Sequence, residues 1–252
     1  MIDFSLEGKI ALITGASRGI GKAIAMTLSE HGADCILVSR KLEGLREVVD
    51  KIEENGAKAT AIACHVGYLD QIESLFKTVR KQYGRLNILV NNAGTNPYLG
   101  EMRGADEAAW DKTHDVNLKG PFFMIKHAVP LMVEAGGGAI VNVSSVSGVS
   151  PGLMQGIYSI TKAGLIAMTK AYARELADKD IRVNALLPGL TRTKFSRALV
   201  DNKEFYDEAI KRIPMGRYAQ PLEMAGAALY LLSDAASYTT GMCLTCDGGL
   251  LA

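Results

Sequence analysis

Two side chains with acid–base character stand four residues apart in a segment whose apolar pattern predicts a helix. Tyr158 and Lys162 occur in the stretch Tyr-Ser-Ile-Thr-Lys, and the helical pattern continues to about Ala177. A spacing of i,i+4 places both side chains on one helix face. A free tyrosine titrates near pH ~10, and a nearby ammonium favours its phenolate. The pair therefore suits proton exchange with a bound molecule, although the same spacing is frequent on ordinary exposed helices.

A second group of polar side chains ends a predicted strand at residues 139–144. The apolar run is followed by the hydroxyls of Ser144 and Ser145. At the carboxyl end of a parallel strand, a serine is placed to hydrogen-bond a ligand oxygen. Both serines also fit an ordinary turn or helix cap, so spacing alone does not choose between them.

A glycine-rich turn follows the first predicted strand and opens a helix. Its glycines have the spacing G-x-x-x-G-x-G. Glycines permit a tight turn and a close approach to a pyrophosphate, and the free N–H groups of the first helical turn attract the anion. The turn predicts a dinucleotide site, although a plain strand-to-helix turn has the same local pattern. The expected contacts are Gly15, Ser17, Arg18, Gly19, Ile20 and Gly21.

The second predicted strand ends in Ser39, Arg40 and Lys41. A dinucleotide fold that uses NAD normally has a carboxylate near this point, which binds the free 2′-hydroxyl of the ribose. Arg18 and Arg40 instead offer guanidinium groups to a 2′-phosphate. The residues favour NADP over NAD, with Ser39 and Arg40 as contacts, although Arg40 and Lys41 also suit a solvated helix start.

The elements that position these residues are short β-rich apolar runs, which alternate with amphipathic helical stretches. The seven runs are residues 9–14, 34–39, 58–64, 86–91, 139–144, 181–187 and 241–246. Right-handed βαβ crossovers then predict a doubly wound α/β Rossmann fold, with a seven-stranded parallel sheet and helices on both faces. No linker, repeat or low-complexity segment divides residues 1–252, so one domain is expected.

Composition narrows the expected partners and compartment. The 28 Lys and Arg residues nearly balance 27 Asp and Glu residues without a basic block, so neither nucleic acid nor a membrane surface is an expected partner. No signal-peptide pattern and no apolar stretch of about 18 residues is present, which predicts a cytoplasmic protein. Cys243 and Cys246 form a C-x-x-C whose odd offset in a β-prone segment puts them on opposite faces, so no metal site is predicted.

Together the motifs resemble the short-chain dehydrogenase/reductase family over essentially the whole sequence. Further motifs of the family follow in the same order, namely Asn91-Asn92-Ala93-Gly94, Asn117, Pro188-Gly189 and Asp247-Gly248-Gly249. The resemblance implies an enzyme that reduces a ketone or aldehyde, or oxidises the alcohol in reverse. NADP is the implied cofactor, with NADPH preferred over NADH.

The resemblance also implies a role for each matching residue. It selects Ser145 over Ser144 as the serine that holds the substrate oxygen, and it makes Tyr158 the general acid/base. Lys162 is implied to lower the pKa of Tyr158 and to bind the nicotinamide ribose, and Asn117 to hold a water through its backbone carbonyl. The implied dinucleotide contacts also include Tyr158, Lys162, Asn92, Ala93, Gly94, Pro188, Gly189, Leu190, Thr191 and Thr193.

One position departs from the family pattern. Cys64-His65-Val66 stands where the family usually has an aspartate that binds the adenine amino group. A neutral imidazole accepts a hydrogen bond at one nitrogen, so His65 and Val66 are expected beside adenine, although His65 also fits a plain surface position. With residues 189–195, this motif resembles the NADP-dependent carbonyl and retinal reductase branch. Animal members of that branch can carry a peroxisomal signal, which the ending Leu-Leu-Ala lacks.

Substrate choice is expected to depend on the loop after the fifth strand and on a substrate loop at about residues 191–215. Met154, Gln155 and Phe195 join Ser145 and Tyr158 as expected substrate contacts, and they favour an aromatic, alicyclic or α-dicarbonyl compound. Cationic residues in the loop also fit the acidic carrier or phosphate arm of a 3-oxoacyl-[acyl-carrier-protein] reductase, or simply a solvated surface. They are Lys194, Arg197, Lys203, Lys211 and Arg212.

Two further expectations follow from the family. Some relatives bind a dinucleotide without catalysis and act as regulators, but the intact Ser145, Tyr158 and Lys162 argue against that role here. The family commonly packs the helices expected near residues 108–133 and 158–177 against a second copy. A homotetramer or homodimer is therefore expected.

Overall fold

Seven short apolar segments form one parallel sheet in the computed structural model, which describes residues 2–196 and 203–252. The strand order is β3-β2-β1-β4-β5-β6-β7. The strands are β1 (Ile10–Thr14), β2 (Asp34–Ser39), β3 (Ala59–Ala63), β4 (Ile88–Asn91), β5 (Gly138–Val143), β6 (Ile181–Pro188) and β7 (Cys243–Cys246). Each lies within its predicted range or extends one residue beyond it. The predicted doubly wound Rossmann fold is confirmed.

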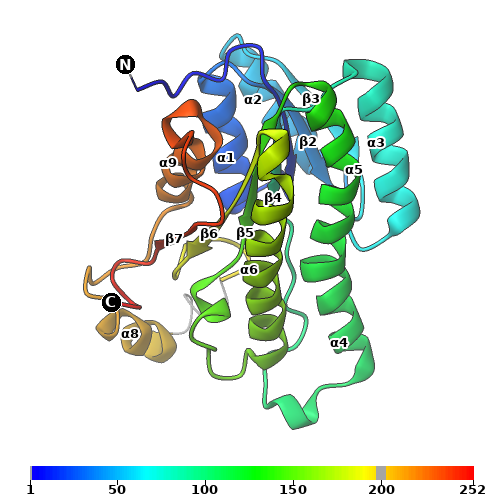
Figure 1. Ribbon diagram of the computed structural model, residues 1–252. Helices are drawn as coiled ribbons and strands as arrows, with labels where there is room; N and C mark the ends of the chain where they lie inside the picture. The colour runs from blue at the N-terminus through cyan, green and yellow to red at the C-terminus, as the bar shows by residue number, and fades with distance from the viewer. Residues whose placement is uncertain (1, 197–202) are drawn as a thin grey trace.

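Helices cover both faces of this sheet (Figure 1). On one face, α1 (Gly19–Glu30), α2 (Glu43–Glu54) and α9 (Pro221–Leu232) bury their apolar side chains against the strands. On the other face, α3 (Leu69–Tyr83), α5 (Gly120–Glu134) and α6 (Gly156–Leu176) do the same. The strands are apolar on both sides because both sides are covered, and β1 is buried at every residue.

The order in which successive strands are added to the sheet changes sides at β1. This strand pairs with β2 on one side and with β4 on the other, so successive crossovers leave it in opposite directions. In an open parallel sheet, such a switch point leaves a crevice beyond the carboxyl ends of the strands. The glycine-rich turn that follows Thr14 opens into this crevice.

Two helices lie outside these layers. The short α4 (Glu107–His114) leads through a π-helical turn, Asp115–Lys119, into α5. The helix α8 (Lys203–Lys211) lies beside the C-terminal end of the chain (Figure 1). A backbone bond of 3.1 Å from Met215 N to Gly248 O ties the segment after α8 to the C-terminal segment.

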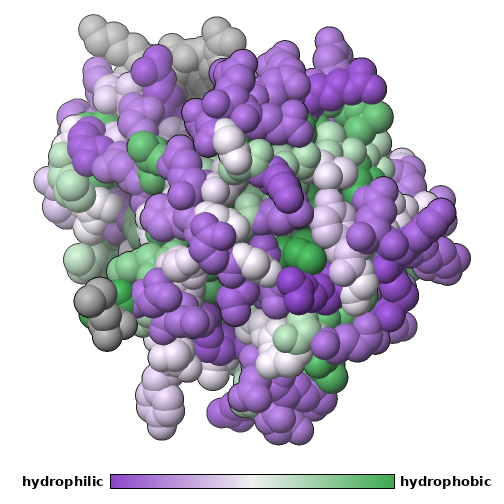
Figure 2. All heavy atoms as spheres, turned by 90° about the horizontal axis from the view of Figure 1, so that it is seen from above, coloured by the Kyte–Doolittle hydropathy of each residue, from purple (hydrophilic) through white to green (hydrophobic). Residues whose placement is uncertain are grey.

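The surface differs from face to face. Seen from above in Figure 2, the molecule is mostly hydrophilic, with small and separate hydrophobic areas. Exposed large apolar side chains occur instead on α4, α5 and α6, where Trp110, Phe122 and Ile160 are each at least 40% exposed. Within the described ranges, no helix has the length and apolarity needed to cross a membrane.

Candidate active site

A cavity of about 1210 Å³ lies at the carboxyl ends of the strands. Its walls are formed by the residues that follow β1 to β6, by the segment around Phe195, and by α8 with the C-terminal segment. The cavity collects residues that are far apart in the sequence, because the carboxyl ends of parallel strands meet at one edge of the sheet.

Most of the predicted site residues line this cavity. Every predicted dinucleotide contact except Gly21 belongs to its wall, and Ser145, Gln155 and Phe195 do so as well. Three predicted site residues do not line it: Gly21, Asn117 and Met154.

The glycine turn after β1 can exist only with glycine at its key positions. Gly15 and Gly19 have φ angles of 67° and 58°, which L side chains rarely adopt. A Cβ atom on Gly21 would lie 2.3 Å from Asn92 Nδ2 and 2.4 Å from Gly15 O. Gly21 does not line the cavity, and its lack of a side chain lets α1 pack closely against the turn.

Thr14 joins the glycine turn to the segment that follows β4. Its hydroxyl accepts hydrogen bonds from Asn92 N at 2.9 Å and from Ala93 N at 3.0 Å. The Asn92 side chain also bonds Thr14, since Asn92 Nδ2 donates to Thr14 O at 2.9 Å. The Asn92 side chain therefore helps to hold the turn in place. Sequence reasoning missed Thr14, because a lone threonine at a strand end has no distinctive spacing.

The turn fits a pyrophosphate. The residue before α1, Arg18, is extended and supplies no side-chain cap to the helix, so the N–H groups of the first turn are open to an anion. Gly15 and Gly19 line the cavity at this point, where the absence of side chains lets a ligand approach the backbone.

Cationic side chains occupy the next part of the wall. Arg18 and Arg40 are exposed and line the cavity, and Lys112 of α4 also lines it. The hydroxyl of Ser39 donates to Lys41 O at 2.9 Å and shapes the end of β2. Sequence reasoning missed Lys112, because only the fold brings this residue of α4 into the cavity wall near His65.

His65 lies in the same region. Its backbone N donates to Gln71 Oε1 at 2.8 Å, and its ring stacks on Tyr68 with centroids 4.4 Å apart. The Gly67 N–H donates to His65 Nδ1 at 3.1 Å, so the neutral ring carries its proton on Nε2. Burial, followed by the nearby Arg40 guanidinium, lowers the pKa of His65. The neutral ring therefore offers a donor at Nε2, whereas the sequence suggested an acceptor.

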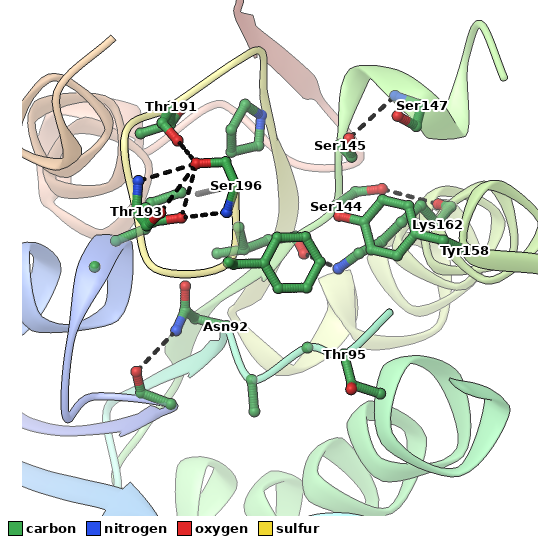
Figure 3. A pocket seen from close by; sticks show the side chains of 18 of the residues that line it. Asn92, Thr95, Ser144, Ser145, Ser147, Tyr158, Lys162, Thr191, Thr193 and Ser196 are labelled. Atoms are coloured by element: carbon green, nitrogen blue, oxygen red, sulfur yellow. Dashed lines mark hydrogen bonds between the residues drawn. The ribbon is translucent and has the colours of Figure 1, made fainter. Parts of the chain in front are cut away.

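Figure 3 shows Ser145, Tyr158 and Lys162 gathered on one side of the cavity. Ser145 Oγ accepts from Ser147 N at 3.1 Å. The neighbouring Ser144 donates its hydroxyl to Lys162 O at 2.8 Å, so it ties β5 to α6. The two serines thus have different positions, and it is the hydroxyl of Ser145 that influences the pKa of Tyr158.

Lys162 is anchored to the end of β5. Its Nζ donates to Val143 O at 2.8 Å and lies 5.5 Å from the centroid of the Tyr158 ring. Burial lowers the pKa of Lys162 to about 8. Burial also raises the pKa of Tyr158 to about 12, and the neighbouring Ser145 hydroxyl opposes that rise. The expected depression of the Tyr158 pKa is absent from this structure, because loss of hydration outweighs the effect of the Ser145 hydroxyl.

Asn117 lies behind this group instead of in the cavity wall. It sits in the π-helical turn and is fully buried. Its amide accepts from Thr95 N at 2.8 Å and donates to Thr95 O at 2.8 Å and to Thr161 Oγ1 at 3.2 Å. Its side chain therefore clamps the segment after β4 to α6. A π-helical turn interrupts the regular backbone bonding at this point, as is frequent at functional sites.

The part of the cavity beside Tyr158 has an aromatic wall. The ring centroids of Phe195 and Tyr158 lie 5.8 Å apart. Gln155 Oε1 accepts from the Ser147 hydroxyl at 3.3 Å. Met154 does not belong to this wall, since its backbone takes a left-handed φ of 62° and its carbonyl accepts from Gly100 N at 3.0 Å. Leu153, which is 89% exposed, lines the cavity in its place.

The segment after β6 completes the site. Ser196 Oγ donates to Thr191 O, and Thr193 N donates to Ser196 Oγ at 3.0 Å (Figure 3). A Cβ atom on Gly19 would lie 3.2 Å from Thr193 Cγ2, so this segment reaches the glycine turn. The predicted substrate loop, residues 191–215, is described except for residues 197–202. Arg197 therefore lies outside the described residues.

Comparison with known proteins agrees with this geometry. A sequence profile of the family described as enoyl-(acyl carrier protein) reductase matches residues 15–251. The 3-oxoacyl-[acyl-carrier-protein] reductase FabG of Thermotoga maritima is 41% identical over 248 residues, which cover 98% of this chain and 99% of that protein. The human dehydrogenase/reductase SDR family member 4 is 40% identical over 244 residues, which cover 97% and 88%.

The chain belongs to the short-chain dehydrogenase/reductase family. A gluconate 5-dehydrogenase from Burkholderia cenocepacia, solved in complex with NADP and tartrate, has the same fold with a TM-score of 0.95. It is 33% identical, and the match covers 99% of this chain and 98% of that one. As a short-chain dehydrogenase/reductase, this chain is an oxidoreductase that acts on a small molecule with a nicotinamide dinucleotide. The open helix N-terminus and the side-chain-free turn at Gly15 and Gly19 fit that cofactor.

Proposed function

We propose that the protein is an NADPH-dependent reductase of ketones or aldehydes, which also oxidises the corresponding alcohols. The observation that carries this proposal is the position of Tyr158. Its phenol lies close enough to the Ser145 hydroxyl for that group to lower its pKa, its ring packs beside Phe195, and Arg18 and Arg40 line the same cavity. A proton donor and a dinucleotide cradle thus share one cavity.

The residues of the chain divide the chemistry between them. When bound, the dinucleotide supplies a hydride for the carbonyl carbon. The Ser145 hydroxyl holds the substrate oxygen, and Tyr158 transfers its proton to that oxygen as negative charge develops there. A tyrosine whose pKa burial raises to about 12 keeps this proton available over the neutral range. In the reverse direction, the phenolate oxygen of Tyr158 accepts the proton from the alcohol.

The other predicted residues act as binding or positioning groups in this proposal. Lys162 would hold the nicotinamide ribose, and the turn around Gly15 and Gly19 the pyrophosphate. Asn117 fixes the segment around Thr95, so we treat it as a positioning residue. Residues 189–193 would meet the nicotinamide half, and residues 191–215 form the proposed substrate loop of a single domain that spans residues 1–252.

NADP is the proposed form of the cofactor. Arg18 and Arg40 line the cavity, and no carboxylate stands at the end of β2 to bind a free 2′-hydroxyl. The Burkholderia relative binds NADP. A guanidinium group pairs well with a phosphate through charge-assisted hydrogen bonds. These features support NADPH over NADH.

The test is the loss of absorbance at 340 nm with purified protein, NADPH or NADH, and a panel of carbonyl compounds. The panel contains aromatic ketones, diketones, retinal, steroids and acetoacetyl thioesters. Turnover faster with NADPH than with NADH supports the proposal. Binding of NADPH without turnover of any carbonyl would instead favour a non-catalytic regulator.

A second candidate function is the reduction of 3-oxoacyl groups carried on an acyl carrier protein. It is favoured by the 41% identity to FabG of Thermotoga maritima and by the cationic residues Lys194 and Arg212 in the cavity wall. Acetoacetyl thioesters in the same panel test it. Turnover of the thioester far above all free ketones would select this function.

A homotetramer, or a homodimer, is the proposed assembly. Trp110, Phe122 and Ile160 expose apolar surface on α4, α5 and α6, whereas the face in Figure 2 is mostly hydrophilic. Burying that surface against a second copy removes it from water. Sedimentation equilibrium at micromolar concentration should show the assembly, and a monomer would contradict it. The four cysteines are free thiols, which suits the proposed cytoplasmic location.

A further inference from the structure

The substrate half of the cavity combines apolar and cationic side chains. Phe195 packs toward Tyr158, and Leu153 lines the same space. Two cationic residues, Lys194 and Arg212, also belong to the wall. Apolar residues of the C-terminal segment complete it: Leu250 and Leu251. Neutral carbonyl compounds would need only the apolar part of this wall, so the two cations require an explanation.

Arg212 is held in place by its surroundings. It directly follows α8, and its backbone N donates to Ala209 O at 3.2 Å. Met215 N donates to Gly248 O at 3.1 Å, which ties the following segment to the C-terminal residues that line the cavity. Arg212 therefore does not depend on α8 alone for its position.

The local charge balance leaves the two cations facing the cavity. Glu208 is the one carboxylate in the described part of the cavity wall, and it pairs with Lys211 at 2.6 Å. Lys211 does not line the cavity. Among the described residues, neither Lys194 nor Arg212 forms an ion pair. Glu208 is also within electrostatic reach of Arg212, so one carboxylate, itself paired with Lys211, stands against the two cations Lys194 and Arg212 in the described wall.

We propose that Arg212 and Lys194 form an anion-binding subsite, and that the substrate is a carbonyl compound with an anionic group. This inference rests on the proposed reductase function. Guanidinium and ammonium groups in a partly water-excluded cavity bind carboxylates and phosphates through charge-assisted hydrogen bonds. The anion is either the carboxylate of an oxo acid or a phosphate of a pantetheine arm, and the apolar wall holds the carbon chain.

The experiment compares three forms of one 3-oxoacyl group: the free oxo acid, its methyl ester and its coenzyme A thioester. The wild type is measured beside Arg212→Gln, Lys194→Gln and Lys170→Gln, with kcat/KM for each substrate and KM for NADPH. Lys170→Gln is the matched control, because it removes the same charge from an exposed residue of α6 that does not line the cavity.

We expect Arg212→Gln to lower kcat/KM for the preferred anionic form about 10- to 100-fold, as for a lost hydrogen bond between charged groups. Lys194→Gln should act in the same direction, and Lys170→Gln should change little. The ester and the KM for NADPH should stay within about 2-fold. Preference for the oxo acid identifies a carboxylate, and preference for the thioester identifies a phosphate.

Two results would overturn the inference. One is that the ester and both anionic forms have equal kcat/KM. The other is that Arg212→Gln changes only the KM for NADPH. If no carbonyl compound is reduced, the proposed function fails separately. In that case, the dissociation constant of the oxo acid for the NADPH-bound protein, with wild type and Arg212→Gln, still decides whether the subsite exists.

Discussion

Lys162 Nζ lies 2.8 Å from Val143 O and 5.5 Å from the centroid of the Tyr158 ring. A single hydrogen bond thus anchors this buried ammonium to the end of β5, and the face of the aromatic ring is close enough to attract it. The two contacts hold the charge in the site but do not replace full hydration. Burial therefore lowers the pKa of Lys162 to about 8.

This arrangement predicts that the lysine destabilises the free protein at neutral pH. Lys162→Met should raise the free energy of unfolding at pH 7 by about 1 to 2 kcal/mol, because it removes a poorly hydrated charge. The pKa of Lys162 in the folded protein, about 8, lies below its value of 10.5 in the unfolded chain. The wild type therefore becomes more stable as the pH rises from 8 to 10.5, and its difference in stability from Lys162→Met shrinks. Urea unfolding of both proteins at pH 7 and pH 10 measures this difference. Lys170→Met, at an exposed position of α6, should show no such difference, and a less stable Lys162→Met protein would contradict the argument.

The same pKa values predict the pH dependence of reduction. Tyr158, with its pKa raised to about 12, stays protonated over the measurable range and causes no loss of its own. Lys162 carries its charge below a pKa of about 8 and loses it above. We therefore expect kcat/KM for reduction to be level in the neutral range and to fall as pH rises through about 8. A rate that increases through this range would refute the role of the charged lysine.

Cofactor preference should depend on Arg40. Arg40→Asp replaces a partner of the 2′-phosphate by a group that repels it and that binds a free 2′-hydroxyl. The ratio of kcat/KM for NADPH to that for NADH should drop about 100-fold or more. Lys41→Asp is the control, since Lys41 lies next in sequence but does not line the cavity. An equal drop in both variants would show that overall charge, and not contact, sets the preference.

Two glycine-to-alanine substitutions should have opposite effects on stability. At Gly21, a Cβ atom would lie 2.3 Å from Asn92 Nδ2, so the turn must shift and both stability and NADPH affinity should fall. At Gly226, an exposed position in α9, nothing lies within 4 Å of an added Cβ. Gly226→Ala should stabilise the protein by about 0.5 to 1 kcal/mol through helix propensity. Thermal unfolding of both variants checks this, and a Gly21→Ala protein of wild-type stability would contradict the packing argument.

The sequence predicted the fold well because the alternation of strands and helices is a local pattern with a strong physical cause. Strands covered on both faces, such as β1, must be apolar throughout. The turn after β1 requires glycine, because Gly15 and Gly19 have positive φ angles. Residues 34–39 accordingly form the predicted strand without any change of bounds. The same reasoning predicted dinucleotide contacts at residues that follow strand ends, and most of these residues line one cavity.

The details that sequence could not supply depend on contacts between distant segments. Gly21 belongs to the motif but packs against Asn92, and Asn117 uses its side chain to clamp Thr95. Neither contact can be predicted from the spacing of residues along the sequence. Met154 and Leu153 are neighbours of similar character, so only the backbone conformation determines which one lines the cavity. The pKa of Tyr158 follows from burial, which no spacing reveals.

The most direct test of the proposed chemistry is the rate of NADPH oxidation by Tyr158→Phe at 340 nm, with any carbonyl compound that the wild type reduces. The substitution removes the phenol oxygen and little else, so NADPH binding, followed by fluorescence, should stay within a few fold. We predict that kcat falls by at least about 100-fold, the usual scale for loss of a general acid. A Tyr158→Phe enzyme that retains wild-type kcat would contradict the assignment of Tyr158 as the proton donor.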